Sequence, residues 1–569
     1  MPLLPLPKRE TTQSKLDSLY LRLKDVYIPT RDGSELCADI FLPLSVEQYE
    51  KVPVLLSMCP YGKDVHALEW GLPQTDIYAK MNAKIEPLGP DAGFEALDPL
   101  IWTTEFGYAL IRIDCRGVGG TPGMLDPFGL QRTLKSGQDA EGNDLYDAIE
   151  WAARQSWCNG KVGMSGISYL GMACWWAAQQ NPPSLKAVVP WEAGSDLLYS
   201  LFRPGGLSNS NFLAHWWKNC VLPYQHGRLE GVSEDELQSH RVDFLKCRSW
   251  EFRSDGSFPI LDRLRRFDNI KIPFYSSANY MDTEVHAPGN ILGYMWGTSQ
   301  TKYLETHTGD HLHAFYSRDG IDRQRCFLDH FLKDDGKSLQ GIPNVDLLVR
   351  KGARTYRRAE QDFPPYDTEY QEYFLTSDGQ LLDEYPGNSN EIIVEYTGLN
   401  SSKVFSTKPL GENFELLGFP YMVLDVATTA KDMDLFITMT NMEPSGDLVQ
   451  LEGNHGEPSV AVTRGYLRLS HRELDEQRST EHLVILSHQS SAPVEPDTRY
   501  QIKVPIQATS MVFEKGHKIQ IELGSRDSET LLDVMKHQGF DRTMDRFGGK
   551  NTIFNGSKII LPFVRRIYQ

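Results

Sequence analysis

The sequence has few of the features that would place the chain in a membrane or on nucleic acid. Nowhere do about 18 apolar residues run together, as a membrane-spanning helix needs. The N-terminal segment MPLLPLPKR is too short and too broken by proline for a signal peptide. Asp and Glu (76) outnumber Lys and Arg (58), and the net charge is −18. Nucleic acids and anionic membranes attract a basic face. We therefore expect a soluble, cytoplasmic protein that binds neither nucleic acid nor membrane.

Recognisable cofactor and metal motifs are also missing. The eight cysteines are scattered, with no C-x-x-C pair, which predicts buried free thiols rather than disulfides or a zinc site. The glycine-rich segment 116–120 fits neither G-x-G-x-x-G nor G-x-x-x-x-G-K-[ST], so we interpret it as an ordinary loop. From these absences we expect no cofactor.

The chain contains three successive kinds of segment. Solidly apolar runs alternate with a segment of helical periodicity at 143–155, a pattern typical of a parallel sheet covered by helices. A stretch rich in Trp, Phe and Leu then predicts a helical insertion, after which the sheet resumes. Beyond residue 336, many short alternating strands predict a β-sandwich or jelly roll. We therefore divide the 569 residues into an α/β core (1–193 and 268–340), a helical cap (194–267) and a C-terminal jelly-roll β-sandwich (341–569).

The segment Gly166-Ile-Ser-Tyr-Leu-Gly171 is the strongest candidate for chemistry. It lies between an apolar run and an Ala-rich segment, so it predicts a strand, a tight turn and a helix. A serine on such a turn projects over the end of a sheet, and the cramped backbone requires small neighbours. Such strings also occur by chance in loops. Ser168 is therefore a candidate nucleophile that needs an acid and a base elsewhere in the chain.

In α/β-hydrolases the acid and the base follow the serine in that order, on loops after successive strands. Asp282 follows the predicted strand 272–277, although a helix cap or a turn could also explain it. Three histidines follow the next predicted strand, 302–306. We choose His311 as the base, because His307 is nearly still in the strand, and His313 is the second candidate.

A metal site is the alternative use of this histidine cluster, since imidazoles and the Asp310 carboxylate lie close together in the sequence. The order does not match H-x-H-x-D-H, no H-E-x-x-H occurs, and no second ligand cluster is evident in the sequence. We therefore expect no metal.

Acyl transfer also needs donors aimed at the developing oxyanion. The backbone N–H of Tyr169 is one candidate, and the phenol of Tyr61, which follows an early strand, is the other. An insertion such as the cap often covers a substrate pocket, although its aromatics could equally be core residues. The substrate-binding candidates are Trp191, Trp216, Trp217 and Glu284; the glutamate could also be a solvent-facing turn residue.

Several motifs in order resemble the cocaine esterase and X-prolyl dipeptidyl peptidase family of serine hydrolases, from about Leu21 to the C-terminus. They are Ile28-Pro-Thr-Arg-Asp-Gly33, Pro60-Tyr-Gly-Lys63, Asp114-x-Arg-Gly117, Trp157-Cys-Asn-Gly-Lys161, Gly166-x-Ser-Tyr-x-Gly171, Asp329-x-Phe-Leu-Lys333 and Arg464-Gly-Tyr-Leu-Arg-Leu-Ser-His-Arg472. The resemblance implies an α/β-hydrolase core, a helical cap and a C-terminal jelly roll. It also implies a Ser168–Asp282–His311 triad with Tyr61 and the Tyr169 N–H as oxyanion hole.

One departure from the family concerns the histidine loop. Relatives usually carry Gly-Pro-Trp-x before the catalytic histidine, whereas this chain has Thr308-Gly-Asp310. We expect the pocket wall to be rebuilt there.

The sequence thus predicts a carboxylesterase-like serine hydrolase that cleaves an ester or activated acyl bond of a small, largely apolar molecule through an acyl-enzyme. An X-prolyl or other aminoacyl peptidase or amidase, and a biosynthetic acyltransferase, stay open on the same scaffold. A non-catalytic binding protein is a further alternative on fold alone. The expected partner is a small-molecule substrate, and a homodimer is left open.

Overall fold

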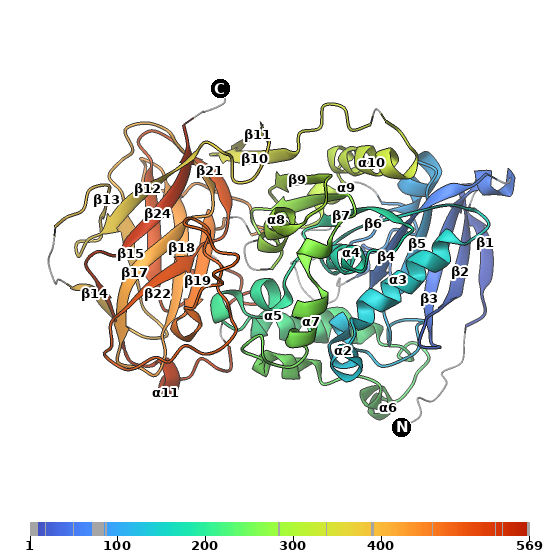
Figure 1. The fold of residues 1–569 in the computed structure, drawn as a ribbon, viewed down its shortest axis with the longest axis horizontal. Helices are drawn as coiled ribbons and strands as arrows, with labels where there is room; N and C mark the ends of the chain where they lie inside the picture. The colour runs from blue at the N-terminus through green and yellow to red at the C-terminus, as the bar shows by residue number, and fades with distance from the viewer. Residues whose placement is uncertain are drawn as a thin grey trace.

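The structure is a computed structural model in which an α/β part and a β part lie side by side (Figure 1). It describes residues 9–16, 19–48, 50–70, 85, 88–282, 285–336, 338–387, 392–457, 459–529, 531–537 and 539–565. Within these ranges, no helix is both long enough and apolar enough to cross a membrane. All eight cysteines are free thiols and seven are buried, as the sequence predicted.

The α/β part is built on one sheet whose strands run antiparallel at one edge and parallel thereafter. In spatial order they are β1 (Thr12–Leu16), β2 (Tyr20–Pro29), β3 (Glu35–Pro43), β5 (Ala109–Asp114), β4 (Val52–Cys59), β6 (Cys158–Ile167), β7 (Leu185–Trp191), β8 (Phe274–Asn279) and β9 (Lys302–His307). Every residue of β4 and β5 is buried, as expected for solidly apolar strands covered on both faces. The predicted α/β-hydrolase core is confirmed.

Helices connect and cover these strands. The longer ones are α2 (Leu130–Ser136), α3 (Ala140–Ala153), α4 (Ser168–Gln180), α8 (Ala287–Trp296) and α10 (Arg318–Leu332); α9 (His313–Tyr316) and the turns Leu44–Gln48, Leu100–Glu105, Pro127–Gly129 and Phe267–Asn269 are shorter. The sequence predicted α3 from its periodicity. Asp139 caps it by accepting from the Gly142 N–H, and its apolar face, including Leu145 and Ile149, is buried.

The cap consists of short helical segments over the carboxyl ends of the parallel strands. They are Leu197–Phe202, Pro204–Gly206, α5 (Ser210–His215), Trp216–Val221, Leu222–Tyr224, α6 (Glu234–Ser239), Phe244–Ser249 and α7 (Phe258–Leu264). The helix α6 ends at Ser239. There His240 and Val242 leave the helix and form backbone hydrogen bonds with Leu125 at 2.9 and 3.0 Å.

The C-terminal part is built mainly of β-strands; its described residues also include the short helix α11 (Met544–Phe547) and the helical turn Leu469–His471. One sheet contains β10 (Val345–Lys351), β11 (Arg354–Glu360), β12 (Thr368–Leu375), β13 (Leu381–Leu382), β14 (Ile392–Thr397), β16 (Phe414–Gly418), β17 (Tyr421–Thr428), β20 (Tyr500–Pro505), β21 (Thr509–Phe513), β23 (Lys550–Phe554) and β24 (Lys558–Val564). The other has the order β15 (Ser402–Ser406), β22 (Lys518–Gly524), β18 (Asp434–Met442) and β19 (Thr463–Arg468). Leu424 and Val504 of the first sheet share one apolar core with Ile437 and Ile521 of the second. The jelly-roll topology stays a prediction.

Strand β10 joins the two parts. Val345 pairs in parallel with Leu304 of β9, and Arg350, further along the same strand, pairs with Met511 of β21. The predicted boundary at residue 340 therefore falls just before a strand that belongs to both sheets. This continuity fixes the β part against the loops that follow β8 and β9.

Candidate active site

Ser168 lies on the sharp turn that the sequence predicted. Strand β6 ends at Ile167, α4 begins at Ser168, and the serine backbone has φ +56°. A Cβ on Gly166 would lie 2.5 Å from the Leu170 Cβ, and one on Gly171 would lie 2.7 Å from the Trp191 carbonyl oxygen. Only glycine fits these two positions, which explains the small residues around the serine.

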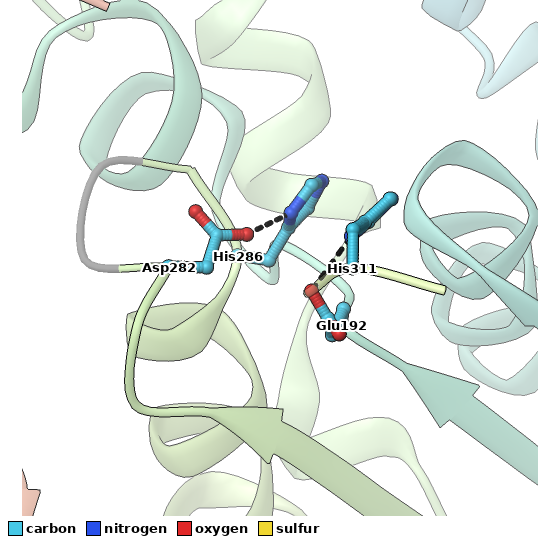
Figure 2. Close-up of side chains that lie close together, drawn as sticks. All are labelled: Glu192, Asp282, His286 and His311. Atoms are coloured by element: carbon cyan, nitrogen blue, oxygen red, sulfur yellow. Dashed lines mark hydrogen bonds and ion pairs between the residues drawn. The ribbon is translucent and has the colours of Figure 1, made fainter. Parts of the chain in front are cut away.

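The imidazole beside Ser168 belongs to His286, not to His311. His286 Nε2 lies 3.0 Å from Ser168 Oγ, and its Nδ1 is hydrogen-bonded to the Asp282 carboxylate (Figure 2). Asp282 and His286 are four residues apart in the segment after β8, and the Ala287 N–H donates to the Asp282 carbonyl at 3.2 Å. The imidazole and its carboxylate therefore come from the same segment of the chain.

Asp282 is held in its charged form. Burial by itself would raise the pKa of this carboxyl, but the neighbouring imidazole of His286 outweighs burial and lowers the pKa to about 2. A permanently charged carboxylate on Nδ1 fixes the imidazole orientation and leaves Nε2 to face the serine.

The predicted base His311 makes a second histidine–carboxylate pair beside the first one (Figure 2). Its Nδ1 lies 2.7 Å from Glu192 Oε2 and its Nε2 lies 3.1 Å from Glu95 Oε1. The prediction that His311 contacts the nucleophile is therefore wrong for this structure, because two buried glutamates occupy both ring nitrogens. The rings of His286 and His311 are nearly parallel, with centroids 5.3 Å apart.

These glutamates change the charge state of His311. Burial by itself would lower its pKa, but Glu192 and Glu95 outweigh burial and raise the pKa well above its usual value. The pKa of Glu192 is also shifted. Burial raises it to about 6, although His311 opposes the rise. His311 is thus an imidazolium between two carboxyl groups.

The other histidines of this loop lie away from Ser168. His313 is exposed at the start of α9, and its N–H donates to Asp310 Oδ1 at 2.9 Å. His307 is fully buried at the end of β9, and burial lowers its pKa to about 3, so it is neutral. The rebuilt loop therefore places one of its three histidines near the site.

Four groups of the site have the spacing that a metal ion would need. Glu192, Asp282, His286 and His311 are buried, and each offers one ligand atom within 4.8 Å of the others. They already form two hydrogen-bonded carboxylate–imidazole pairs, which suits proton transfer without a metal. Of the four residues that the sequence offered as an alternative metal site, His307, Asp310, His311 and His313, this group contains His311.

Both predicted oxyanion donors lie at the nucleophile. The Tyr169 N–H is in the first turn of α4, where backbone N–H groups lack an intrahelical acceptor. Tyr61 lines the same pocket as Ser168, and its phenol oxygen accepts a hydrogen bond of 3.2 Å from the Trp216 indole. The Tyr169 side chain has a structural role, because its hydroxyl donates to Glu141 at 2.7 Å.

A small, mostly apolar pocket opens onto Ser168. The core contributes part of its wall and the cap covers it, as the sequence led us to expect. The lining residues are Tyr61, Phe128, Ser168, Tyr169, Met172, Leu201, Phe212, Leu213, Trp216, Val285 and His286.

Of the predicted substrate-binding residues, only Trp216 is placed at this pocket. Trp191 is fully buried at the end of β7, where it packs on His307 and Phe315, so the prediction of a substrate contact is wrong. Trp217 lies at a separate hollow of the cap and packs on Phe244, which corrects the prediction for this residue too. Glu284 lies outside the described residues.

Comparison with known proteins agrees with this architecture. Residues 32–248 match the X-Pro dipeptidyl-peptidase (S15 family) model, and residues 339–558 match the X-Pro dipeptidyl-peptidase C-terminal non-catalytic domain. The predicted family resemblance is confirmed. The chain is a member of the cocaine esterase and X-Pro dipeptidyl-peptidase group of hydrolases.

Individual relatives of the group span nearly the whole chain. Cocaine esterase of Rhodococcus sp. (strain MB1 Bresler) is 23% identical, with 97% of this chain and 100% of the esterase aligned. Xaa-Pro dipeptidyl-peptidase of Ligilactobacillus salivarius is 23% identical over 86% of this chain and 71% of its own length. A CocE/NonD family hydrolase from Staphylococcus aureus superposes with a TM-score of 0.83 over 99% of this chain and 100% of its own, at 24% identity. The fold is therefore shared across the group.

Three residues of this hydrolase site escaped the sequence analysis. His286 could have been found, because Asp282 and His286 have the i, i+4 spacing of one helical turn immediately before a Pro-containing helix start. Glu192 directly follows the end of β7, which is a usual place for functional side chains. Glu95 lies in a segment without clear periodicity, and nothing in the sequence signals it.

Proposed function

We propose that the protein is a serine hydrolase that cleaves an ester bond of a small, largely apolar molecule through an acyl-enzyme. The observation that carries this proposal is the chain of hydrogen bonds from Asp282 through His286 to Ser168 Oγ at the floor of an apolar pocket. A serine hydroxyl is a weak nucleophile until a neighbouring base can take its proton.

In acylation, Ser168 Oγ attacks the substrate carbonyl carbon while His286 Nε2 takes the hydroxyl proton. The Asp282 carboxylate stabilises the imidazolium that forms and keeps Nδ1 protonated. Collapse of the tetrahedral intermediate breaks the bond to the leaving group, which receives the proton from His286. The acyl group then remains on Ser168.

Two donors stabilise the oxyanion in this proposal, the Tyr169 N–H and the Tyr61 phenol. The Tyr61 phenol, whose oxygen accepts from the Trp216 indole N–H on the cap side, donates its proton to the substrate carbonyl oxygen. Such preorganised donors contribute about 10²–10³ in kcat when they act in a dry site.

Substrate class follows from the pocket. Its wall is mostly aliphatic and aromatic, which suits a small apolar acyl group. Two relatives support an ester substrate by name: cocaine esterase, and an α-amino acid ester hydrolase that superposes with a TM-score of 0.69 at 17% identity. The Xaa-Pro dipeptidyl-peptidase relatives keep an aminoacyl-prolyl amide as the second candidate substrate.

The deciding experiment is labelling with a fluorophosphonate probe followed by peptide mapping. We expect the adduct on Ser168 and no labelling of Ser168→Ala. Turnover of p-nitrophenyl and alkyl esters is then compared with turnover of a Gly-Pro anilide. A folded wild-type protein that takes no label would rule out the serine mechanism, and exclusive cleavage of the anilide would favour the peptidase.

A further inference from the structure

Two buried glutamates hold the backbone of the serine turn from opposite sides. The Glu95 carbonyl accepts from the Ile167 N–H, and the Glu192 carbonyl accepts from the Ser168 N–H, each at 3.1 Å. Both glutamates have left-handed backbones, with φ of +60° and +41°. Residues other than glycine rarely adopt this conformation, and where they do it often serves a functional site. The carboxyl groups are thus fixed relative to the nucleophile.

The Glu95 side chain faces the reacting serine. It is 3% exposed, and one carboxyl oxygen, Oε1, is bonded to His311. The other oxygen, Oε2, is buried, with no described donor at normal hydrogen-bond distance. Burial raises the pKa of Glu95; His311 opposes the rise, and so does the Ser168 hydroxyl. Once Ser168 carries an acyl group its hydroxyl is lost, which leaves the buried carboxyl oxygen to another proton donor.

We propose that Glu95 is a second catalytic base, which activates the water that releases the acyl group from Ser168, and that His311 and Glu192 position it. This inference rests on the proposed acyl-enzyme mechanism. It assigns the two half-reactions to different groups: His286 serves acylation, and Glu95 serves deacylation.

The proton and bond changes of deacylation balance within the residues present. Water gives one proton to Glu95 as its oxygen bonds to the acyl carbon. The tetrahedral intermediate then collapses, the bond from that carbon to Ser168 Oγ breaks, and Glu95 returns the proton to Oγ. The products are a carboxylic acid and the free serine, and no group is oxidised or reduced.

His311 fixes the orientation of the Glu95 carboxyl group. As an imidazolium it donates to Glu95 Oε1 on one side and to Glu192 on the other, so it fixes which oxygen of Glu95 faces the site. The backbone N–H of His311 is held in turn by the Asn454 carbonyl at 2.9 Å, from the C-terminal part. His311 is therefore a positioning residue, one step removed from the reacting atoms.

Glu95→Gln tests the proposal, since glutamine keeps the shape and removes the base. With p-nitrophenyl acetate in a stopped-flow instrument, we expect a burst of one p-nitrophenolate per active site at the wild-type rate. Steady-state turnover should then be at least about 100-fold slower. Peptide mapping should find the acetyl group on Ser168. Glu415→Gln, which changes a buried glutamate of the C-terminal part, should keep wild-type turnover.

The outcomes of this experiment distinguish a failure of the role of Glu95 from a failure of the proposed serine mechanism. A burst that falls in parallel with turnover, or turnover within about 3-fold of wild type without acetyl-enzyme, would overturn the role of Glu95. If Glu95→Gln does not fold, Glu95→Asp and His311→Gln carry the test, and each should accumulate acetyl-enzyme while keeping the wild-type rate of fluorophosphonate labelling. Absence of labelling in the wild type would instead overturn the proposed function itself.

Discussion

Two histidine–carboxylate pairs lie side by side in this protein, and they differ in what the second nitrogen of each ring contacts. Figure 2 shows His286 paired with Asp282 and His311 paired with Glu192. His286 turns its Nε2 to Ser168, whereas His311 turns its Nε2 to Glu95. The first imidazole therefore faces a hydroxyl that it can deprotonate. The second lies between two carboxyl groups and holds its proton. The two histidines therefore differ in role because the second ring nitrogen of each contacts a different group.

Replacing each histidine with alanine should give the largest contrast. His286→Ala removes the base for Ser168, and kcat toward an aryl ester should fall by about 10⁶. His311→Ala should lower kcat by about 10² and leave the rate of fluorophosphonate labelling unchanged. If His311→Ala instead lost labelling and His286→Ala kept it, the assignment of the two pairs would be reversed.

Changing the carboxylates should give the next largest effect. Asp282→Asn removes the charge that keeps Nδ1 of His286 protonated, and we expect kcat to fall by about 10⁴. Glu192→Gln should cost about 10-fold, because the Glu95 contact of His311 persists. Steady-state kinetics with one aryl ester measures both, and similar losses in the two variants would contradict the division of roles.

The oxyanion donors belong to the His286 side of the comparison. Tyr61→Phe should lower kcat by about 10²–10³, as the loss of one oxyanion donor does elsewhere. Trp216→Phe removes only the indole N–H that orients the phenol, and we expect a loss of about 3-fold to 10-fold, in line with one neutral hydrogen bond. An unchanged kcat in Tyr61→Phe would remove this residue from the oxyanion hole.

The two pairs should also differ in how pH affects stability, which is the smallest of the four effects. Asp282 has a lowered pKa of about 2, so its contribution is present above the ordinary Asp pKa and is lost as pH falls toward 2, at a cost of about 2 kcal/mol. The pKa of His311 is raised, so its contribution is complete below pH 6.5 and declines as pH rises.

Urea unfolding at a series of pH values measures this difference. Asp282→Asn should remove the loss of stability on the acid side, and His311→Gln should remove the decline on the alkaline side. If both variants changed the same side of the profile, the charge states assigned to the two pairs would be wrong.

Much of the fold was accessible from the sequence, because it depends on local signals. The strand–Gly-x-Ser–helix pattern predicted the turn at Ser168, and the solidly apolar runs predicted β4 and β5. The change to short alternating strands after residue 336 predicted the β part. Periodicity and turn chemistry are properties of neighbouring residues, so no tertiary information was needed.

The C-terminal part shows the limit of such signals. The sequence did not predict that β10 pairs with β9 of one sheet and β21 of the other, since strand pairing joins residues far apart in the chain. For the same reason Asn454, which holds the histidine loop, could not be connected with the site from its position in the sequence.

The sequence by itself predicted Ser168, which we propose as the nucleophile, the Asp282 carboxylate beside the candidate base, and the family architecture. Only the tertiary structure decided which histidine contacts Ser168. The order of motifs along the chain favours His311, but Glu95 and Glu192 come from other segments and occupy both nitrogens of that ring. His286, from the segment after β8, contacts Ser168 instead. Strand order can place a loop near a serine, but only packing determines which side chain faces it.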